Sequence, residues 1–167
     1  MDGKNLNRSI TRMAHEILER NKGLDNVVFV GIKTGGAYLA ERLADKLLDI
    51  EGVRPQVYHL DAGPYRDDVQ IEGREREPLK DLEIVGKTVI LVDDVLYTGR
   101  TVRAALDALM ATGRARMVQL AALIDRGHRE LPIRPDFVGK NVPTARDEFI
   151  SVELTDTDDE DGVWIVG

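Results

Sequence analysis

The chain has 167 residues, of which 43% are apolar and 5% aromatic, and this composition indicates a globular protein rather than a disordered one. We expect one domain that spans residues 1–167. The absence of cysteine excludes disulfide scaffolds, thiol catalysis and cysteine-based zinc sites. No apolar run approaches the ~20 residues of a membrane span, and the N-terminus lacks a signal-peptide pattern, so a cytoplasmic location is expected.

The net charge of −7 is concentrated at the C-terminal end of the chain. Residues 153–167 hold six acidic side chains and no lysine or arginine, whereas residues 1–152 hold 24 acidic and 23 basic side chains, a net charge of −1. The body of the protein can therefore present a basic face. The acidic stretch is expected to be a solvated connection between strands.

Hydrophobic periodicity predicts strands and helices in alternation. Helices are expected over residues 5–22, around 39–47 and over 101–110, and strands at 27–30, 57–60, 89–92, 117–124, 137–138, 149–154 and 163–166. The continuous apolar runs are typical of strands buried on both faces. The chain is thus predicted to adopt an α/β fold, a mostly parallel twisted sheet with helices on both faces. Residues 62–86 show no clear period and predict a long loop, which in a compact domain is usually functional.

The strand at 89–92 leads into Asp93 and Asp94 and then, through Thr98 and Gly99, into a helix. A helix N-terminus with a glycine and hydroxyl side chains makes a phosphate cradle. Adjacent carboxylates do not favour phosphate, but they suit sugar hydroxyls or a water-bridged Mg²⁺ ion. The motif predicts a pocket for a ribose 5-phosphate. The plainer alternative is an aspartate pair that caps a helix.

Two other phosphate chemistries are excluded by sequence. A P-loop needs Gly-x-x-x-x-Gly-Lys-[Ser/Thr], which is absent. A receiver-type phosphoacceptor would carry acidic residues after the first strand, where residues 31–36 read Gly-Ile-Lys-Thr-Gly-Gly. With three histidines and no cysteine, a transition-metal site is not expected.

Residues 89–101, Val-Ile-Leu-Val-Asp-Asp-Val-Leu-Tyr-Thr-Gly-Arg-Thr, resemble the phosphoribosyl-diphosphate (PRPP) motif of type I phosphoribosyltransferases. Further motifs at residues 11–16, 65–68, 125–134 and 139–144 resemble those of the bifunctional pyrimidine-operon attenuation regulator/uracil phosphoribosyltransferase (PyrR) family. The resemblance runs from about Ser9 to about Val152. It implies the type I phosphoribosyltransferase fold, with a small hood or lid over the site.

The resemblance also implies residue roles. Asp93 and Asp94 would contact the PRPP ribose, with Mg²⁺ held by PRPP and water and by no direct protein ligand. The 5-phosphate would be enclosed by Tyr97, Thr98, Gly99, Arg100 and Thr101, and the diphosphate would lie at Lys33, Thr34 and Gly35. Uracil would lie near Ile124, Asp125 and Arg126. The lid, within residues 62–86, would include Tyr65, Arg66, Asp67 and Asp68.

The second implied activity is binding of a stem-loop in a pyrimidine leader mRNA, strengthened by UMP or UTP, without DNA or membrane as partners. The first helix and the segment 126–140 carry basic clusters, each of which alone is more often a solvated face. The resemblance assigns RNA contacts to Thr11, Arg12, His15, Arg20, His128, Arg129, Arg134 and Lys140. A homodimer or higher homo-oligomer is expected.

The function implied is therefore conversion of uracil and PRPP to UMP and diphosphate, together with regulation of pyrimidine operons by transcription attenuation. One departure stands out, since the family usually has arginine where Gly35 stands. Loss of that charge predicts weaker diphosphate binding. It favours the alternative of an RNA-binding, nucleotide-sensing regulator with little or no transferase activity. A purine-salvage transferase without RNA function is disfavoured by the segment 126–132.

Overall fold

The computed structural model describes residues 1–65 and 82–167. The helices are α1 (Gly3–Asn21), α2 (Gly35–Glu51), η1 (Gly63–Tyr65, a 3-10 turn) and α3 (Arg100–Thr112). The strands are β1 (Val27–Ile32), β2 (Gln56–Leu60), β3 (Thr88–Leu96), β4 (Met117–Asp125), β5 (Phe137–Asn141), β6 (Phe149–Glu153) and β7 (Gly162–Val166). Each predicted helix and strand is present in the predicted order. Of the expected lid residues, Arg66, Asp67 and Asp68 lie outside the described residues.

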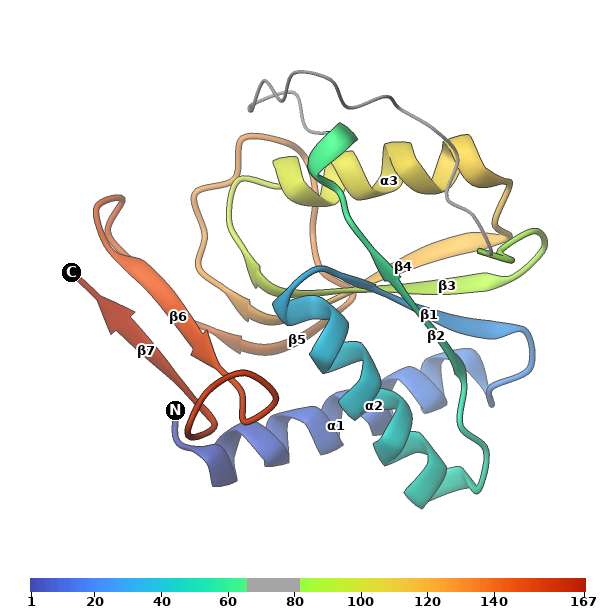
Figure 1. Cartoon of the computed structure of the whole chain (residues 1–167), viewed down its shortest axis with the longest axis horizontal. Coiled ribbons are helices and arrows are strands. Elements are labelled where there is room, and N and C mark those ends of the chain that lie inside the picture. The colour runs from blue at the N-terminus through green and yellow to red at the C-terminus, as the bar shows by residue number, and fades with distance from the viewer. Residues whose placement is uncertain (66–81) are drawn as a thin grey trace.

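Five strands form a parallel sheet in the order β2-β1-β3-β4-β5, and β6 and β7 form a separate antiparallel hairpin. Helices α1 and α2 cover one face of the sheet and α3 covers the other (Figure 1). The predicted α/β architecture with helices on both faces is confirmed. The order reverses direction at β1, which is the kind of switch point where ligands bind in open parallel sheets.

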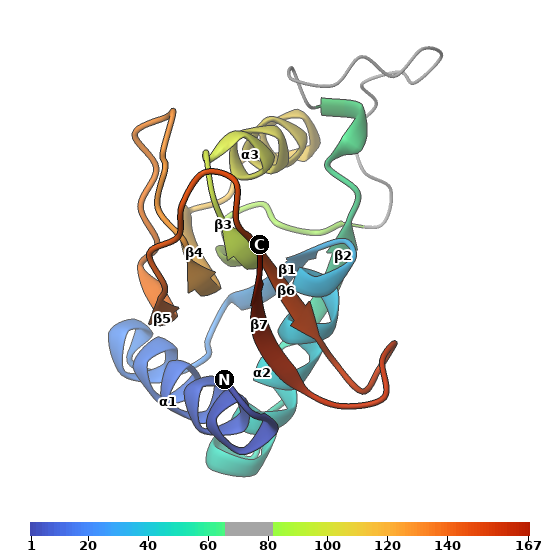
Figure 2. The same ribbon diagram turned by 90° about the vertical axis from the view of Figure 1, so that its left-hand side faces the viewer.

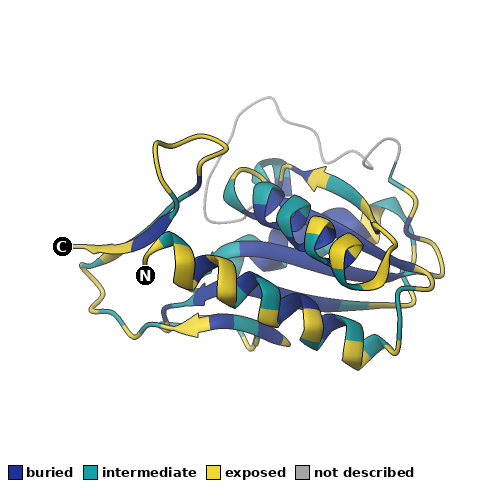
Figure 3. Ribbon diagram, turned by 90° about the horizontal axis from the view of Figure 1, so that it is seen from below, coloured by how far each residue is buried: buried dark blue, intermediate teal, exposed yellow. Residues whose placement is uncertain are grey.

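The alternation of side chains along the strands produces one core on each face of the sheet. On the α1/α2 side, Phe29 and Ile90 of the sheet pack with Leu43 of α2. On the α3 side, Leu91 packs with Val102 and Leu109. The central strands are buried on both faces, and each helix exposes only its outer side (Figure 3). This explains why these strands read as continuous apolar runs in the sequence.

Strand β3 is longer than predicted. The apolar run ends at Val92, but parallel pairing with β4 continues through Asp93↔Ala122 and as far as Leu96↔Asp125. Backbone hydrogen bonds to a central neighbour therefore extend the strand through residues that hydropathy alone assigns to a loop. As a result, Asp93 and Asp94 stand on a rigid strand and not on the connection after it.

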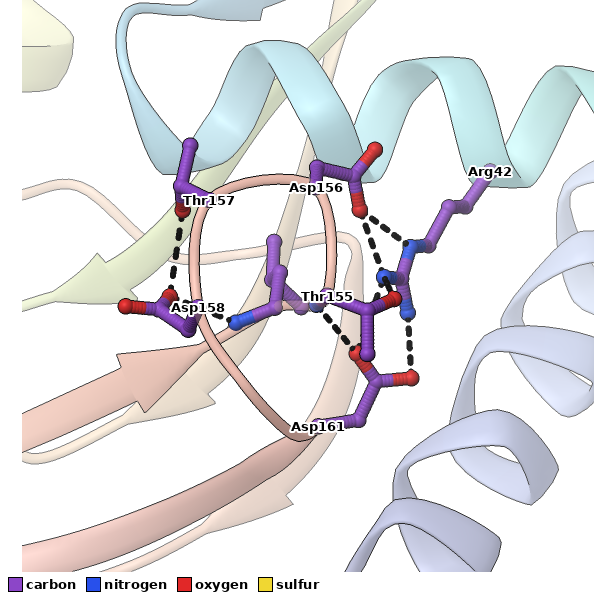
Figure 4. A network of polar contacts seen from close by, with 7 residues as sticks. Arg42, Thr155, Asp156, Thr157, Asp158 and Asp161 are labelled. Carbon is purple, nitrogen blue, oxygen red and sulfur yellow. Dashed lines mark hydrogen bonds and ion pairs between the residues drawn. The ribbon is translucent and has the colours of Figure 1, made fainter.

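The β6–β7 hairpin is fastened to the first two helices at the end where the chain termini lie (Figure 2). The Met1 amino group donates to Val163 O at 2.8 Å, and Val163 N donates to Met1 O at 2.8 Å. Arg42 of α2 forms hydrogen bonds and ion pairs with the acidic connection between β6 and β7 (Figure 4). The Arg42 guanidinium donates to both carboxylate oxygens of Asp161, at 2.8 and 2.9 Å, and to Asp156 Oδ1 at 2.6 Å. The expected strand connection is thus confirmed, although it is partly tied down.

Replacement of Arg42 by alanine is expected to loosen this connection and to lower stability by about 1–2 kcal/mol, which is roughly 2–8 °C in Tm for a chain of this size. Thermal unfolding followed by circular dichroism measures the change. Arg54→Ala is the matched control, because Arg54 also contacts two carboxylates, Glu41 and Asp45, but is more exposed, at 36% against 21% for Arg42. Equal decreases in Tm in the two variants would show that the Arg42 network contributes no more to stability than an exposed ion pair does.

The same network predicts a pH dependence. The hydrogen bond from Arg42 lowers the pKa of the Asp161 carboxyl below its ordinary value of 3.8. A carboxyl group whose pKa is lowered on folding stabilises the protein above its unfolded pKa and loses that contribution as the pH falls. Acid unfolding below about pH 4 is therefore expected to be shallower in Arg42→Ala than in the wild type.

Within residues 1–65 and 82–167, no helix is both long enough and apolar enough to cross a membrane.

Candidate active site and RNA-facing surface

The loops that the sequence singled out meet at one edge of the sheet, where the parallel strands end. Register places Leu96 of β3 beside Asp125 of β4, and Asp125 beside Asn141 of β5. On the other side of β3, β1 ends at Ile32 and leads directly into Lys33. The carboxyl ends of adjacent parallel strands thus gather the expected ribose, diphosphate and base regions at one edge.

The two aspartates of β3 face different loops. Asp93 is 6% exposed and lines a cavity of about 200 Å³ together with Thr98, Gly99 and Thr101. Asp94 lies instead against the turn after β1, with its carboxylate next to Gly35. Successive side chains of a strand point to opposite faces, which accounts for this division. One carboxylate therefore lies beside each of the two expected phosphate loops.

The expected 5-phosphate loop, residues 97–101, enters α3 through Gly99, which has a φ of 95° that favours glycine. Arg100 N donates to Thr98 Oγ1 at 3.2 Å, and Arg103 N donates to Gly99 O at 2.9 Å. The predicted helix start after a Thr-Gly pair is confirmed. This geometry leaves the N-terminal end of α3 facing the cavity that Asp93 lines, as an anion cradle requires.

The turn between β1 and α2 packs closely on β3. A Cβ atom at Gly36 would lie 2.3 Å from Val92 O, so only glycine permits this approach. The peptide bond between Lys33 and Thr34 is cis, and both side chains are exposed at the edge of the site. The turn therefore brings Gly35 against Asp94, and Lys33 lies two residues earlier in the same turn.

Gly35 has a structural role that the sequence did not reveal. A Cβ atom at this position would lie 2.3 Å from Asp94 Oδ2 and 2.8 Å from Asp94 Cγ. Asp94 Oδ1 meanwhile accepts a hydrogen bond from Val95 N at 2.7 Å. The place that a side chain at residue 35 would take is thus filled by the Asp94 carboxylate.

The expected uracil region, Ile124 to Arg126, lies at the end of β4. Ile124 is buried in the core, and Asp125 accepts a hydrogen bond from Arg129. Arg126 is 4% exposed and lies over the Tyr97 ring, with its Cζ 4.0 Å from the ring centroid. The guanidinium also donates to Thr144 Oγ1 at 3.0 Å and to carbonyl groups of the connection that follows β5. Arg126 therefore stacks the 5-phosphate loop on that connection.

The residues expected to contact RNA fall into two groups in the structure. Three arginines are engaged within the chain: Arg12 donates to Gly139 O at 2.5 Å, Arg20 pairs with Asp136 at 3.0 Å, and Arg129 pairs with Asp125 at 2.6 Å. Thr11 and His128 donate to backbone carbonyls. Within the described residues, no hydrogen bond or ion pair involves the side chains of His15, Arg134 and Lys140, which are all exposed.

Two hollows on this side of the molecule are lined by basic residues. One, of about 450 Å³, lies beside the ends of β4 and β5 and includes His128, Arg129 and Arg134. The other, of about 460 Å³, lies between α1 and β5 and includes Arg8 and Lys140. The predicted basic face of the first helix and the basic segment after β4 are therefore brought onto neighbouring surfaces by the packing of α1 on β5.

Comparison with known proteins agrees with this geometry. The phosphoribosyl transferase domain family matches residues 2–156. The Bifunctional protein PyrR of Brevibacillus brevis is 59% identical over 169 residues, covering 99% of this chain and 94% of that protein. The Bifunctional protein PyrR of Bacillus mycoides is 55% identical over 170 residues, with the same shares covered. This chain belongs to the PyrR family of phosphoribosyltransferases.

Solved structures support the fold of this PyrR family member. The hypoxanthine phosphoribosyltransferase of Trypanosoma cruzi matches with a TM-score of 0.75 at 18% identity, covering 99% of this chain and 94% of that one. Its complex with the product IMP matches with a TM-score of 0.74 at 20% identity, covering 99% and 86%. At these identities the likeness establishes the fold alone. The predicted type I phosphoribosyltransferase fold, family and transferase class are confirmed, and PyrR membership agrees with the main function expected.

The carboxylates of Asp93 and Asp94 are hard oxygen groups that would suit water-mediated contact with a magnesium ion bound by PRPP. Hard oxygen ligands suit Mg²⁺, which usually keeps several waters and binds phosphates through one or two carboxylates. Within the described part of the chain, no group of three or more histidine, aspartate or glutamate side chains could hold a metal by itself. These residues therefore suit an ion whose direct ligands are substrate oxygens and water.

Two aromatic residues acquire significance only in the folded structure. Phe149, which the sequence suggested only as part of a strand, is 63% exposed, and its ring centroid lies 6.0 Å from Arg126 Cζ. An exposed aromatic ring at the edge of a site can stack on a flat base. Tyr65, expected in the lid, is 4% exposed and packs into the core on the α3 side. The sequence could not indicate the exposure of Phe149, because an apolar residue in a predicted strand is expected to be buried.

Proposed function

We propose that the protein transfers the phosphoribosyl group of PRPP to uracil, forming UMP and diphosphate, and that uridine nucleotides in the same site control its binding to a pyrimidine leader RNA. The observation that carries this proposal is the cavity lined by Asp93 and the loop at the start of α3. A carboxylate beside an anion cradle fits a ribose 5-phosphate, which carries both hydroxyl groups and a phosphate.

In this proposal each element has one task. The amide groups at the start of α3 and the hydroxyls of Thr98 and Thr101 hold the 5-phosphate, while Asp93 accepts hydrogen bonds from the ribose. Asp94 and Lys33 face the diphosphate side, and Mg²⁺ carried by PRPP would supply charge neutralisation for the diphosphate there. Uracil lies at the end of β4, placed so that its N1 can reach the anomeric carbon as diphosphate departs. Both this reaction and RNA binding would take place in the cytoplasm.

The RNA surface that we propose joins the two basic hollows. Phosphate contacts fix a protein on RNA, and polar side chains reach the splayed bases of a loop. His15, Arg134 and Lys140 are suited to such contacts because they are exposed and have no intramolecular polar partner within the described residues. Arg12 and Arg20, by contrast, contribute charge while they hold β5 against α1.

The decisive experiment is a spectrophotometric assay of UMP formation from uracil and PRPP with Mg²⁺. Hypoxanthine and guanine serve as competing bases, because a purine-salvage transferase remains the rival enzyme class. Turnover with uracil and none with purines is the expected result. Turnover with a purine instead would overturn the assignment of substrate.

The alternative function, a nucleotide-sensing RNA regulator with little catalysis, is favoured by Gly35. It is distinguished by the same assay together with calorimetry: UMP binding without turnover supports the alternative.

Two variants of Gly35 separate its steric role from its missing charge. In Gly35→Ala the new Cβ displaces the Asp94 carboxylate, so affinity for both UMP and PRPP is expected to fall. Gly35→Arg carries the same displacement but adds a charge-assisted contact to diphosphate, worth about 1.5–3 kcal/mol, or roughly 10–150-fold in affinity. We therefore expect Gly35→Arg to exceed Gly35→Ala in PRPP affinity and to equal it in UMP affinity, as measured by calorimetry. Equal PRPP affinities would show that residue 35 does not face the diphosphate.

Assembly into a homo-oligomer is also proposed. Its support is one face of the β6–β7 hairpin, where Phe149, Trp164 and Val166 are 63%, 39% and 49% exposed. Light scattering coupled to size-exclusion chromatography measures the state, and a monomer at micromolar concentration would contradict it.

A further inference from the structure

The segment that follows β4, residues 126–133, runs alongside the 5-phosphate loop, residues 97–101, and the residue before it, Leu96. Backbone hydrogen bonds between them are Arg126 N to Leu96 O at 3.1 Å, Glu130 N to Thr98 O at 2.9 Å, and Leu131 N to Thr98 O at 3.2 Å. An ion pair adds Arg100 Nε to Glu130 Oε1 at 2.8 Å. The 5-phosphate loop is thus held from outside by the segment that carries part of the basic surface.

Arg129 is the side chain that ties this arrangement together. Its Nη1 donates to Tyr97 O at 2.8 Å, its Nη2 to Asp125 Oδ2 at 2.6 Å, and its Nε to Ile133 O at 2.8 Å. One planar guanidinium therefore joins the 5-phosphate loop, the end of β4 and the far end of the 126–133 segment. With a side-chain exposure of 22%, it is poorly placed for contact with a macromolecule.

We infer that Arg129 is a positioning residue for the 5-phosphate loop, and that through it the occupancy of the phosphate site is linked to the basic segment. The inference deepens the proposed function and rests on it. Arg129 fixes the carbonyl of Tyr97 and so sets the path of the loop into α3. A loop held in its binding conformation loses less entropy when phosphate binds, so its affinity depends on that restraint.

The same contacts give a physical route between the two sites. A bound 5-phosphate restrains the loop, and the loop in turn restrains residues 126–133, which include His128 and lead to Arg134. His128 also packs edge-on against the Tyr97 ring, with centroids 5.9 Å apart. Binding at one site therefore biases the conformation of the other, and coupling of this kind acts equally in both directions.

Three variants test the inference: Arg129→Ala, Arg129→Lys and, as a control for loss of one positive charge, Arg146→Ala. Arg146 is exposed on the connection after β5 and belongs to neither site. The measurements are the Kd of UMP by calorimetry, the KM values for PRPP and uracil, and amide hydrogen exchange at residues 97–100. Gel shifts with a pyrimidine leader hairpin, with and without UMP, complete the set.

For Arg129→Ala we expect the UMP Kd and the PRPP KM to rise by roughly 10–100-fold, with a change of about twofold or less in the uracil KM. Exchange at residues 97–100 should become faster, and UMP should no longer strengthen RNA binding. Arg129→Lys keeps the charge but cannot serve three acceptors in one plane, so it should resemble Arg129→Ala in nucleotide binding. Its RNA affinity without UMP should stay close to that of the wild type.

Other results would overturn the inference. Unchanged UMP binding with reduced RNA binding in Arg129→Ala would make Arg129 an RNA contact only. Recovery of UMP affinity in Arg129→Lys would make its charge, and not its geometry, decisive. A large drop in Tm with equal effects on PRPP and uracil would indicate a general structural role. Wild-type protein that binds neither UMP nor PRPP would refute the proposed function as well, whereas wild-type binding matched by the variants refutes the inference alone.

Discussion

Replacement of Asp93 and Asp94 together by asparagine is expected to abolish most of the affinity for PRPP and UMP while the fold is kept. Each carboxylate that accepts hydrogen bonds from a ligand contributes about 1.5–3 kcal/mol, so loss of both corresponds to roughly 10²–10⁴-fold in affinity. The change is isosteric, and the asparagine oxygens can still accept the bonds that Asp94 N and Val95 N donate to these side chains. Calorimetry with UMP, and the assay of UMP formation, measure the loss.

A matched control applies the same chemical change elsewhere. Asp25 and Asp49 are exposed and lie outside the site, so the double variant Asp25→Asn, Asp49→Asn should bind UMP as the wild type does. The single variants add information, because the two carboxylates face different loops. Asp93→Asn should weaken the binding of UMP and of PRPP to a similar extent. Asp94→Asn should weaken the binding of PRPP more than the binding of UMP. Unchanged UMP affinity in the Asp93, Asp94 double variant would remove the ribose site from the proposal.

The second large effect is expected on RNA binding. Replacement of Arg134 and Lys140 together by alanine removes two exposed positive charges from the basic surface and should reduce affinity for a pyrimidine leader hairpin by about 10–100-fold at low salt. The slope of log affinity against log salt concentration should become shallower by roughly 1–2, because two phosphate contacts are lost. Gel shifts at several stated salt concentrations measure both quantities. UMP binding should stay unchanged.

Arg114→Ala with Arg116→Ala is the matched control. These residues are exposed between α3 and β4, at the end of the sheet opposite the site, and their loss changes the net charge by the same amount. If this variant weakens RNA binding as much as the Arg134, Lys140 variant does, the interaction depends on net charge and not on the proposed surface. A wild type that does not prefer the hairpin over scrambled RNA would leave a transferase without the regulatory function.

Much of this site could be predicted from local sequence because it depends on local chemistry. The apolar run before Asp93 and the Thr-Gly pair before α3 predicted a strand and a helix start, which the structure confirms, and an anion cradle, which stays a prediction. The turn with Lys33 was located because it directly follows a predicted strand, but its expected diphosphate role came only from the family resemblance. Parallel topology then required these loops to meet at the carboxyl edge of the sheet, as they do.

Contacts between distant residues were invisible to that reasoning. Hydropathy ended the third strand at Val92, whereas pairing with β4 extends it to Leu96. From the sequence, glycine at position 35 was interpreted as the loss of an arginine charge. In the structure, the absence of a side chain at Gly35 makes room for the Asp94 carboxylate. Nothing in the acidic C-terminal stretch indicated that Arg42, more than a hundred residues earlier, would grip it.

The sequence by itself determined the order of elements, the nature of the strand-end loops and the residue types available for ribose, phosphate and RNA, since these depend on periodicity and on short motifs. Only the tertiary structure decided which basic residues form hydrogen bonds and ion pairs within the chain and which are exposed and can contact a partner. Arg12, Arg20 and Arg129 satisfy carbonyl and carboxylate groups that the packing of α1, β4 and β5 brings beside them. A guanidinium donates hydrogen bonds to the acceptors that lie near it in the folded protein. The sequence does not indicate which acceptors these are, because they come from segments far apart in the chain that meet only on folding.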